Sequence, residues 1–365
     1  MRNVTRKLLA IALGLGMALG LGACGQKVEP AAKPADTTQA SGDKAAADDP
    51  YASAREFYAG KDIKVVCPQK AGGNNDICAR LVATYMKDLL GAKSVTVENM
   101  DGGSGIICYN WLVSAADKDG TVFAVGSQPA TNAIVNADPA CQFGAMDFNY
   151  LGTIQEDYFC ISANPDGPYA DLDYVLNSDA ITMASTAVND AHTYAGVAAL
   201  ECMGIPNAKI IGGYGSVADG ALAMEQGEVN LNASGNITAL KNENEVPLFI
   251  LAKDRDPSLP DCPTIYEVFP EMDGECKNLL ECLPRNIKLI LTNQGVPEDR
   301  VKFLEYCVDQ MFADTQFAED LKSQTGLAFT GGQNAEETTA VAQNYVDHKD
   351  DYAKWPEYVN RYIVN

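Results

Sequence analysis

The sequence predicts an α/β fold in which mainly parallel sheets with flanking helices form two lobes, joined by two chain crossings. Three observations lead to this prediction. Short apolar strand runs alternate with amphipathic helical runs, and glycine-rich loops follow several of the strands. Two extended runs, residues 149–164 and 246–254, are placed to leave the first lobe and to return to it. The length of 365 residues suits two domains of about 150 residues each.

The first elements alternate as strand, loop and helix. A β-branched run, DIKVVC, is followed by a Gly-Gly loop and by apolar residues at helical spacing, with Asn74 or Asn75 as the cap and Gly91 as the stop. A second strand, a DGGSG loop, a helix and a third strand come next. The first helix is expected over residues 77–90 and the second over residues 106–116. The second strand is expected over residues 94–99 and the third over residues 121–127. In parallel sheets of this kind, ligands bind beyond the carboxyl ends of the strands.

The two crossings divide the rest of the chain. We expect residues 57–155 and 251–365 to form lobe I and residues 156–250 to form lobe II. Pro297 opens a helix that runs to about residue 312 and packs on lobe I. The stretch 335–355 is expected to be helical and mostly at the surface.

The amino terminus is typical of an export signal. Three cations precede an apolar, glycine-rich run, and the segment ends in Leu-Gly-Ala-Cys, as in a bacterial lipobox. Residues 1–23 are therefore expected to be a lipoprotein signal peptide, and Cys24 is expected to carry the lipid. Residues 24–56 would be a flexible tether, because Pro, Ala, Thr, Ser, Lys and Asp dominate it. The alternative is an ordinary secretory signal. The expected location is the outer face of the cytoplasmic membrane.

Composition excludes several functions. With 27 Lys and Arg against 49 Asp and Glu, the formal net charge is −22, which disfavours a nucleic-acid partner. Only two histidines are present, so a His-rich metal site is excluded, and no cofactor is expected. The hydrophobic content of 47% excludes general disorder. Of the 11 cysteines, the ten after Cys24 form no CxxC pair, and mostly free, buried thiols are favoured over five disulfides.

Motifs in a fixed order suggest a family. A strand is followed by Pro, a Gly-Gly loop and Asp-x-x-Ala-Arg on a helix, and later segments supply Val-Glu-Asn, GGSG, Asp-Gly-Thr, Tyr-Gly-Ser, Gly-Glu-Val-Asn and Leu-Pro-Asp-Cys-Pro-Thr. Their residues are Pro68, Gly72, Gly73, Asp76, Ala79, Arg80, 97–99, 102–105, 119–121, 214–216, 227–230, 259–264 and Glu267. This order resembles the substrate-binding proteins of tripartite tricarboxylate transporters, the Bug-type receptors.

The resemblance implies a two-lobed periplasmic-binding-protein type II (Venus flytrap) fold and a small carboxylate ligand. It implies a membrane permease with one large and one small subunit as the partner, with the receptor itself a monomer. Three departures stand out: Asn230 replaces an acid, Lys70 lies in the first ligand loop, and Pro284-Arg285 replace an aromatic-rich stretch.

The residues themselves support anion binding. Backbone N–H groups in the first turn of a helix lack intrahelical partners, and the helix dipole adds about half a positive charge there. One Gly-rich loop and one hydroxyl-rich loop each lead into a helix, so two facing helix starts are expected to clamp a carboxylate. The candidate ligand-binding residues are Lys70, Gly72, Gly73, Asn74, Asn75, Ser127 and Thr131 on one lobe and Ser185, Thr186, Asn189 and Ser216 on the other. His192 could also donate, whereas Arg80 and Arg285 are expected to be structural or at the surface.

Other functions are less well supported. A GxGxxA pattern begins at Gly213, but no ribose-binding acid follows at the required distance, and GxSxG and GxxxxGK motifs are absent. No catalytic residue is therefore expected. An enzyme on the same scaffold would need a converging titratable pair, and a sensory or adhesion module would need an exposed apolar patch. The sequence thus predicts an exported, lipid-anchored solute receptor that catalyses no reaction.

Overall fold

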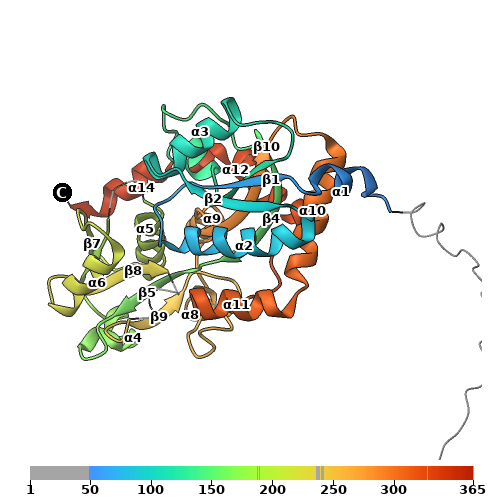
Figure 1. Cartoon of the computed structure of the whole chain (residues 1–365). Helices are drawn as coiled ribbons and strands as arrows, with labels where there is room; N and C mark the ends of the chain where they lie inside the picture. Colours follow the sequence, from blue (N-terminus) through green and yellow to red (C-terminus); the bar gives the residue numbers. More distant parts are fainter. Residues whose placement is uncertain are drawn as a thin grey trace, which may run out of the picture. The chain divides into compact units, whose positions relative to one another are not determined.

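The computed structural model describes residues 49–364, except 187, 189, 236–238, 240–241 and 327. The expected signal peptide, the lipidation site Cys24 and the tether up to residue 48 lie outside the described residues. The described chain forms two sheets flanked by helices (Figure 1).

The first sheet has the order β2-β1-β3-β10-β4. Its first three strands are parallel, as the strand–loop–helix repeat predicted, whereas β10 runs antiparallel to both neighbours. The strands are β1 (Asp62–Cys67), β2 (Ser94–Asn99), β3 (Val122–Gly126), β4 (Phe148–Glu156) and β10 (Ile287–Asn293). Strand β10 comes late in the sequence, but it lies inside this sheet, between β3 and β4.

Helices cover both faces of the first sheet. One face packs on α2, α10 and α11, and the other on α3 and α12, because alternate strand residues belong to two separate apolar clusters. The helix α1 packs on α10. The bounds are α1 (Ala52–Tyr58), α2 (Asn74–Leu90), α3 (Ile106–Ser114), α10 (Glu298–Phe312), α11 (Thr315–Thr325) and α12 (Ala335–Asp347), with short turns η1 (Gly103–Gly105) and η2 (Thr131–Val135).

The second sheet has the order β11-β7-β6-β8-β5-β9. Its strands are β5 (Phe159–Ala163), β6 (Ala180–Ala184), β7 (Asn207–Ile211), β8 (Leu231–Gly235), β9 (Val246–Ile250) and β11 (Ile363–Val364). Its helices are α4 (Leu172–Leu176), α5 (Ala191–Met203), α6 (Val217–Glu225), α8 (Ile265–Val268) and α9 (Gly274–Glu281), with the turn η3 (Pro168–Ala170). Strands β6, β7 and β8 are parallel, so their carboxyl ends share one edge.

The carboxyl edges of the two sheets face each other. Strand β4 ends at Glu156 and β5 begins at Phe159, so the chain passes directly from the edge of one sheet to the edge of the other. The start of β5 pairs with Gly235, the last residue of β8. A Cβ atom on Gly235 would overlap the carboxylate of Asp157 in the crossing segment. Loops that follow the parallel strands of both sheets therefore meet at this junction.

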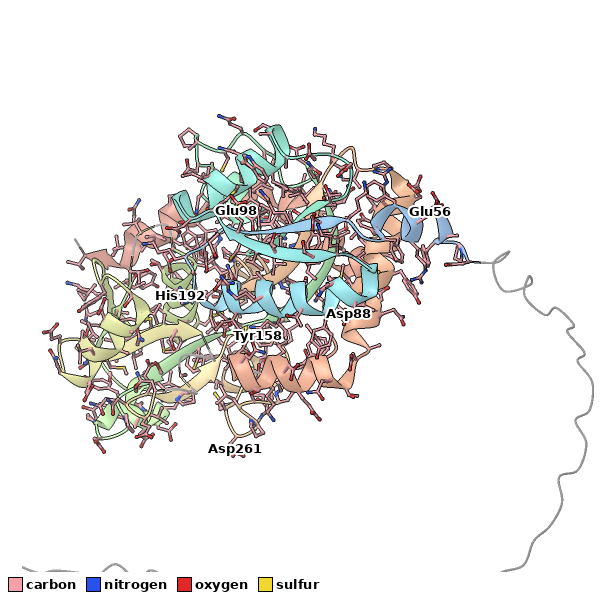
Figure 2. All side chains as sticks on the ribbon, in the orientation of Figure 1. Glu56, Asp88, Glu98, Tyr158, His192 and Asp261 are labelled. Carbon is pink, nitrogen blue, oxygen red and sulfur yellow. A yellow bond between two sulfur atoms is a disulfide. The ribbon has the colours of Figure 1, made fainter. Side chains whose placement is uncertain are left out.

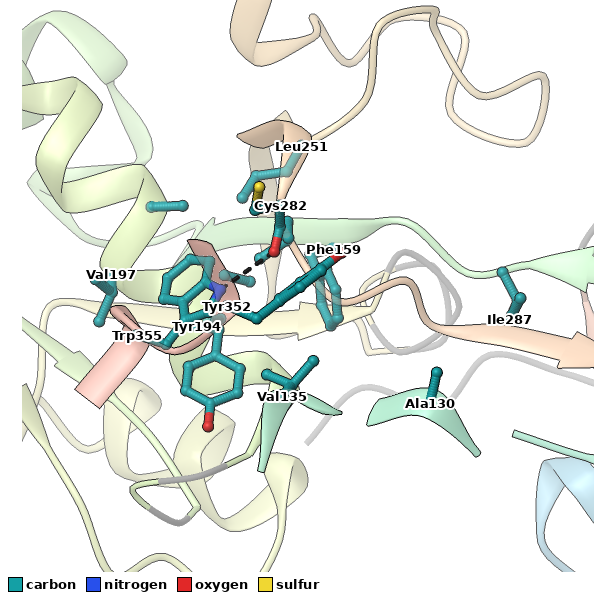
Figure 3. Packing of buried hydrophobic residues seen from close by; sticks show 14 of the residues in the cluster. Ala130, Val135, Phe159, Tyr194, Val197, Leu251, Cys282, Ile287, Tyr352 and Trp355 are labelled. Carbon is teal, nitrogen blue, oxygen red and sulfur yellow. Dashed lines mark hydrogen bonds between the residues drawn. The ribbon is translucent and has the colours of Figure 1, made fainter. Parts of the chain in front are cut away.

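Residues 335–355 are helical and mostly at the surface, as expected, but the carboxyl-terminal helices also bury several large side chains. Tyr345, Tyr352 and Trp355 are each 1% exposed and belong to a cluster that also contains residues of both sheets. The Trp355 ring packs on the Tyr194 ring of α5, with 5.0 Å between the ring centroids. The Trp355 Nε1–H donates to the carbonyl of Cys282 (Figure 3). The last helices, α13 (Lys349–Tyr352) and α14 (Trp355–Tyr362), thus carry one apolar core from the first sheet to the second.

The strand pairings also bear on the expected lobe boundaries. We still propose two lobes that exchange at about residues 156 and 250. However, α9 contacts α5 and β11 pairs with β7, so these two segments, expected in lobe I, lie with the second sheet. Residues 52–56, expected in the tether, belong to α1.

Most cysteines of the described chain are free thiols. Cys202 and Cys276 form a disulfide that joins α5 to α9. Seven free cysteines are buried and one, Cys141, is partly exposed; the seven are Cys67, Cys78, Cys108, Cys160, Cys262, Cys282 and Cys307. The preference for buried thiols over a full disulfide framework is therefore confirmed for these residues.

Removal of the disulfide is expected to lower the free energy of unfolding by about 2–4 kcal/mol, because it closes a loop with a sequence separation of 74. The Cys202→Ser/Cys276→Ser double variant should show this loss in urea unfolding and should not respond to reductant. Wild-type protein should lose the same amount when reduced. Equal stability of the wild type and the double variant under oxidising conditions would contradict the structural role of this disulfide.

Candidate ligand-binding site

The start of α2 has no side-chain cap. Its N-cap residue is Gly73, which corrects the expectation of Asn74 or Asn75, and no side chain accepts from the first turn. Gly73 has φ −79° and ψ 169°, an ordinary extended conformation. The backbone N–H groups of Asn74, Asn75 and Asp76 have no intrahelical acceptor at these positions. A 17-residue helix therefore presents free donors and the positive end of its dipole.

The Gly-Gly loop before α2 is fixed by a hydrogen bond to the side chain of Asp76 in the first turn of that helix. Gly72 has φ +87°, which favours glycine, and its N–H donates to Asp76 Oδ2 at 2.8 Å. Arg80 and Asn99 also donate to this carboxylate. Burial acts to raise the pKa of Asp76, but these hydrogen bonds outweigh it and hold the pKa below its usual range. The Gly72 N–H is thus engaged, and the free donors are the N–H groups in the first turn of α2.

Buried polar side chains lie beside this helix start. Asn75 is 1% exposed and donates from Nδ2 to Ser127 Oγ at 3.0 Å, whereas its Oδ1 has no partner. Gln128 is 3% exposed; its Oε1 accepts from Ala130 N and from the Tyr150 hydroxyl, and its Nε2 has no partner. An unpaired buried amide costs free energy, so these atoms are suited to a polar ligand.

Three further polar residues, which the sequence analysis missed, line the same edge of the first sheet. Gln155 on β4 pairs in register with Lys288 on β10, and both are 6% exposed. Lys288 Nζ donates to Asn286 Oδ1 at 2.8 Å. Burial lowers the pKa of Lys288, and the nearby Asp157 carboxylate acts in the opposite direction. Only the β4–β10 pairing, which no local motif signals, brings these residues together.

The second sheet contributes a small recess where β6 and β8 end and α5 and α6 begin. Ser185, Thr186, His192 and Ser216 line it, so three predicted ligand residues meet here. The Ser185 hydroxyl pairs with Thr193, and Ser216 caps α6 by accepting from Asp219 N. Asn189, the remaining predicted residue of this lobe, lies outside the described residues.

The start of α5 differs from that of α2 because it carries its own anion. Asp190 is the N-cap, and it accepts from His192 N at 2.8 Å and from the His192 ring at 2.9 Å. Burial acts to raise the pKa of Asp190, but the hydrogen bonds and the charge of His192 outweigh it and lower the pKa. The expected clamp of two equivalent helix starts is therefore not what the structure contains. His192, labelled in Figure 2, lies at this start. Its ring packs edge-on against the Phe159 ring.

The other predicted residues have structural partners or are solvated. The Lys70 side chain is 86% exposed and lies 3.8 Å from Asp101. The Thr131 N–H donates to the Gln128 carbonyl. Arg80 pairs with Asp76 and Arg285 pairs with Glu156 through two nitrogens, in line with the structural role expected for both arginines.

A larger cavity of about 560 Å³ lies at the crossing segments. Glu156, Arg285 and Lys253 contribute charged groups to its wall, and His348 comes from the turn after α12. None of the predicted ligand residues lines it. The described helices include none that is long and apolar enough to cross a membrane.

Comparison with known proteins agrees with this architecture. No family model matches the chain. A curated relative from Agrobacterium vitis, the UPF0065 protein in the TAR-I ttuE-ttuC' intergenic region, is 28% identical over 228 residues. That match spans 59% of this chain but only 64% of the relative's length.

Solved structures match a larger share of this chain than the curated relative does. A TctC solute-binding protein from Polaromonas has a TM-score of 0.67 at 16% identity and covers 83% of this chain and 99% of its own. The periplasmic binding protein BugD has a TM-score of 0.60 at 22% identity and covers 84% of this chain and 100% of its own. Rpa4515 from R. palustris, solved with adipate, has a TM-score of 0.63 at 19% identity and covers 81% of this chain and 97% of its own.

The fold is that of a two-lobed type II periplasmic binding protein. The resemblance to the receptors of tripartite tricarboxylate transporters, first seen in the sequence motifs, is confirmed by the TctC and BugD neighbours at the level of the fold. By their names, these neighbours are binding proteins.

Proposed function

We propose that this protein is an exported solute receptor that captures a small organic carboxylate between its two lobes. The observation that carries the proposal is the uncapped start of α2, where Gly73 supplies no side chain, together with the unpaired, buried Nε2 donor of Gln128. Free backbone donors at a helix start bind anions without a cationic side chain. This matters in a protein whose net charge of −22 would repel an anion at long range.

The hydrogen-bond donors at the start of α2 and beside it differ in strength. The first-turn N–H groups of α2 act together with the helix dipole and would hold the charged end of the ligand. Gln128 Nε2 offers a further donor, and Ser127 is already oriented by Asn75. The second lobe, with Asp190 at the start of α5, suits a hydroxyl or other donor group of the ligand better than a second carboxylate. The adipate bound to Rpa4515 is a carboxylate of the proposed class.

Ligand-dependent thermal stabilisation tests this function directly. A panel of mono-, di- and tricarboxylic acids should contain at least one that raises the melting temperature, because a ligand at 100 times its Kd adds about 2.7 kcal/mol to the stability of the folded state. Uncharged amides of the same acids serve as matched controls and should give no shift. A complete absence of shifts across the panel, with the protein folded by circular dichroism, would overturn the proposal.

Gln128→Met is expected to weaken carboxylate binding about tenfold, as measured by calorimetry. The substitution keeps the side-chain volume but removes the unpaired Nε2 donor, and one hydrogen bond to a charged group contributes about 1.5–3 kcal/mol. It also removes the acceptor of the Tyr150 hydroxyl, which retains the Ala145 carbonyl at 2.6 Å. Tyr150→Phe is the control for that loss. Equal affinities of Gln128→Met and wild type would remove Gln128 from the site.

Delivery of the ligand and anchoring of the chain are further parts of the proposal. Lipid on Cys24 would hold the receptor at the outer face of the cytoplasmic membrane, near a permease with one large and one small subunit. Cys24→Ser should release the protein into the soluble fraction of the producing cells, with ligand affinity unchanged. A Cys24→Ser protein that still sediments with membranes would contradict lipid anchoring.

A further inference from the structure

A second polar cluster lies beside the cavity at the crossing segments. Cys282 follows the last turn of α9, and His348 and Asp351 come from the turn between α12 and α13. One side-chain ligand atom from each residue lies within 4.8 Å of the others. Cys282 is 7% exposed, whereas the His348 and Asp351 side chains are 49% and 46% exposed. The cluster therefore has a buried sulfur and an open side.

The spacing of the His348 nitrogen and the Asp351 oxygen suits a tetrahedral metal ion. His348 Nδ1 and Asp351 Oδ2 lie 3.4 Å apart. Two ligands at the usual zinc distances of about 2.0–2.1 Å, arranged tetrahedrally, are separated by roughly 3.3–3.4 Å. The other carboxylate oxygen of Asp351 pairs with Lys354 Nζ at 2.8 Å, which holds the carboxylate in place without occupying Oδ2.

The backbone around the sulfur is also held in place. The Cys282 N–H donates to the Asn278 carbonyl, and the Cys282 carbonyl accepts from Trp355 Nε1 (Figure 3). Burial raises the pKa of the Cys282 thiol to about 11, so a metal ion has to displace its proton on binding.

We propose that Cys282, His348 and Asp351 bind one zinc-class divalent ion, with water as the fourth ligand. Sulfur, imidazole and carboxylate are the ligand types that zinc takes, and three protein ligands with one open position are a known zinc arrangement. The composition argument against a His-rich site does not exclude this one, because it needs a single histidine. The inference does not depend on the proposed carboxylate function.

The position of the site gives the ion a structural consequence. The disulfide ties α9 to α5 on the second sheet, whereas α12 packs on β4 of the first. His348 also lines the cavity at the crossing segments. A metal that joins α9 to the α12–α13 turn therefore links the two lobes beside their junction.

The test uses purified protein without a histidine tag, treated with a chelator and then titrated with Co²⁺ or Zn²⁺. One equivalent of Co²⁺ should bind and give a thiolate-to-cobalt charge-transfer band, and Zn²⁺ should displace it. Cys282→Ser should abolish the band, and His348→Gln and Asp351→Asn should each weaken Zn²⁺ binding at least tenfold. Cys141→Ser and Asp350→Asn are the matched controls and should bind as the wild type does.

Two outcomes would overturn the site. One is wild-type protein that binds no Co²⁺ or Zn²⁺ at a stoichiometry of one. The other is Cys282→Ser protein that remains folded by circular dichroism and keeps the charge-transfer band. The largely exposed His348 side chain makes His348→Gln the variant least prone to unfolding, so its Zn²⁺ affinity decides the matter if Cys282→Ser is unstable.

Discussion

Gly73→Asp is expected to reduce carboxylate affinity by at least 100-fold. The new carboxylate would sit at the N-cap of α2 and accept from the first-turn N–H groups that the ligand needs. Two charge-assisted hydrogen bonds are worth about 3–6 kcal/mol together, and each 1.4 kcal/mol is a factor of ten in Kd. The free energy of unfolding should stay within about 1 kcal/mol of wild type, because Asp is a favourable N-cap. Calorimetry and urea unfolding measure the two effects separately.

Gly73→Ala is the matched control. A Cβ at this position would lie 3.5 Å from the Lys70 carbonyl, an ordinary contact, and the backbone conformation suits any residue. The alanine variant should bind the ligand within a few-fold of wild type. If Gly73→Asp binds as tightly as Gly73→Ala, the start of α2 is not the carboxylate site.

Trp355→Ala is expected to lower the free energy of unfolding by about 3–5 kcal/mol, the usual cost of deleting a large buried aromatic ring. Trp355 is 1% exposed and packs on Tyr194 of the second lobe, and it donates to the Cys282 carbonyl at 3.2 Å. Its loss would open a cavity in the core that both sheets share. Urea unfolding followed by circular dichroism gives the measurement.

Trp355→Phe separates packing from hydrogen bonding. Phenylalanine keeps most of the ring contact with Tyr194 but cannot donate to Cys282, so a loss of about 1–2 kcal/mol is expected. The expected order of stability is wild type, then Trp355→Phe, then Trp355→Ala. A Trp355→Ala protein within 1 kcal/mol of wild type would show that the carboxyl-terminal helices add little to this core.

The sequence predicted best those features that local signals determine. The β1 strand, the body of α2 and its stop at Gly91 follow from β-branched residues, helical spacing and a left-handed C-cap. The predicted N-cap of α2 lies one or two positions after the observed one, because Asn is a better capping residue than Gly in isolation. That difference matters, since an uncapped start is the feature that makes α2 suitable for an anion.

Features that depend on distant pairing could not be predicted. Gln155 and Lys288 meet only because β4 and β10 are antiparallel neighbours, and no local pattern around either residue indicates that pairing. The capping role of Asp190 was accessible, because an Asp directly before a helical run is a common N-cap. The hydroxyl-rich loop before Asp190 gives no sign of this anion, which makes the two helix starts different in charge.

One free thiol of the described chain is accessible to a chemical label. Cys141 is the one free cysteine of the described chain that is not buried, and it follows Asn136, whose side-chain oxygen accepts from the Tyr194 hydroxyl across the lobe boundary. A maleimide dye should therefore label this position selectively in native protein. Such a label, only five residues from the Asn136–Tyr194 hydrogen bond, would report on ligand-dependent changes at this contact without any engineered cysteine.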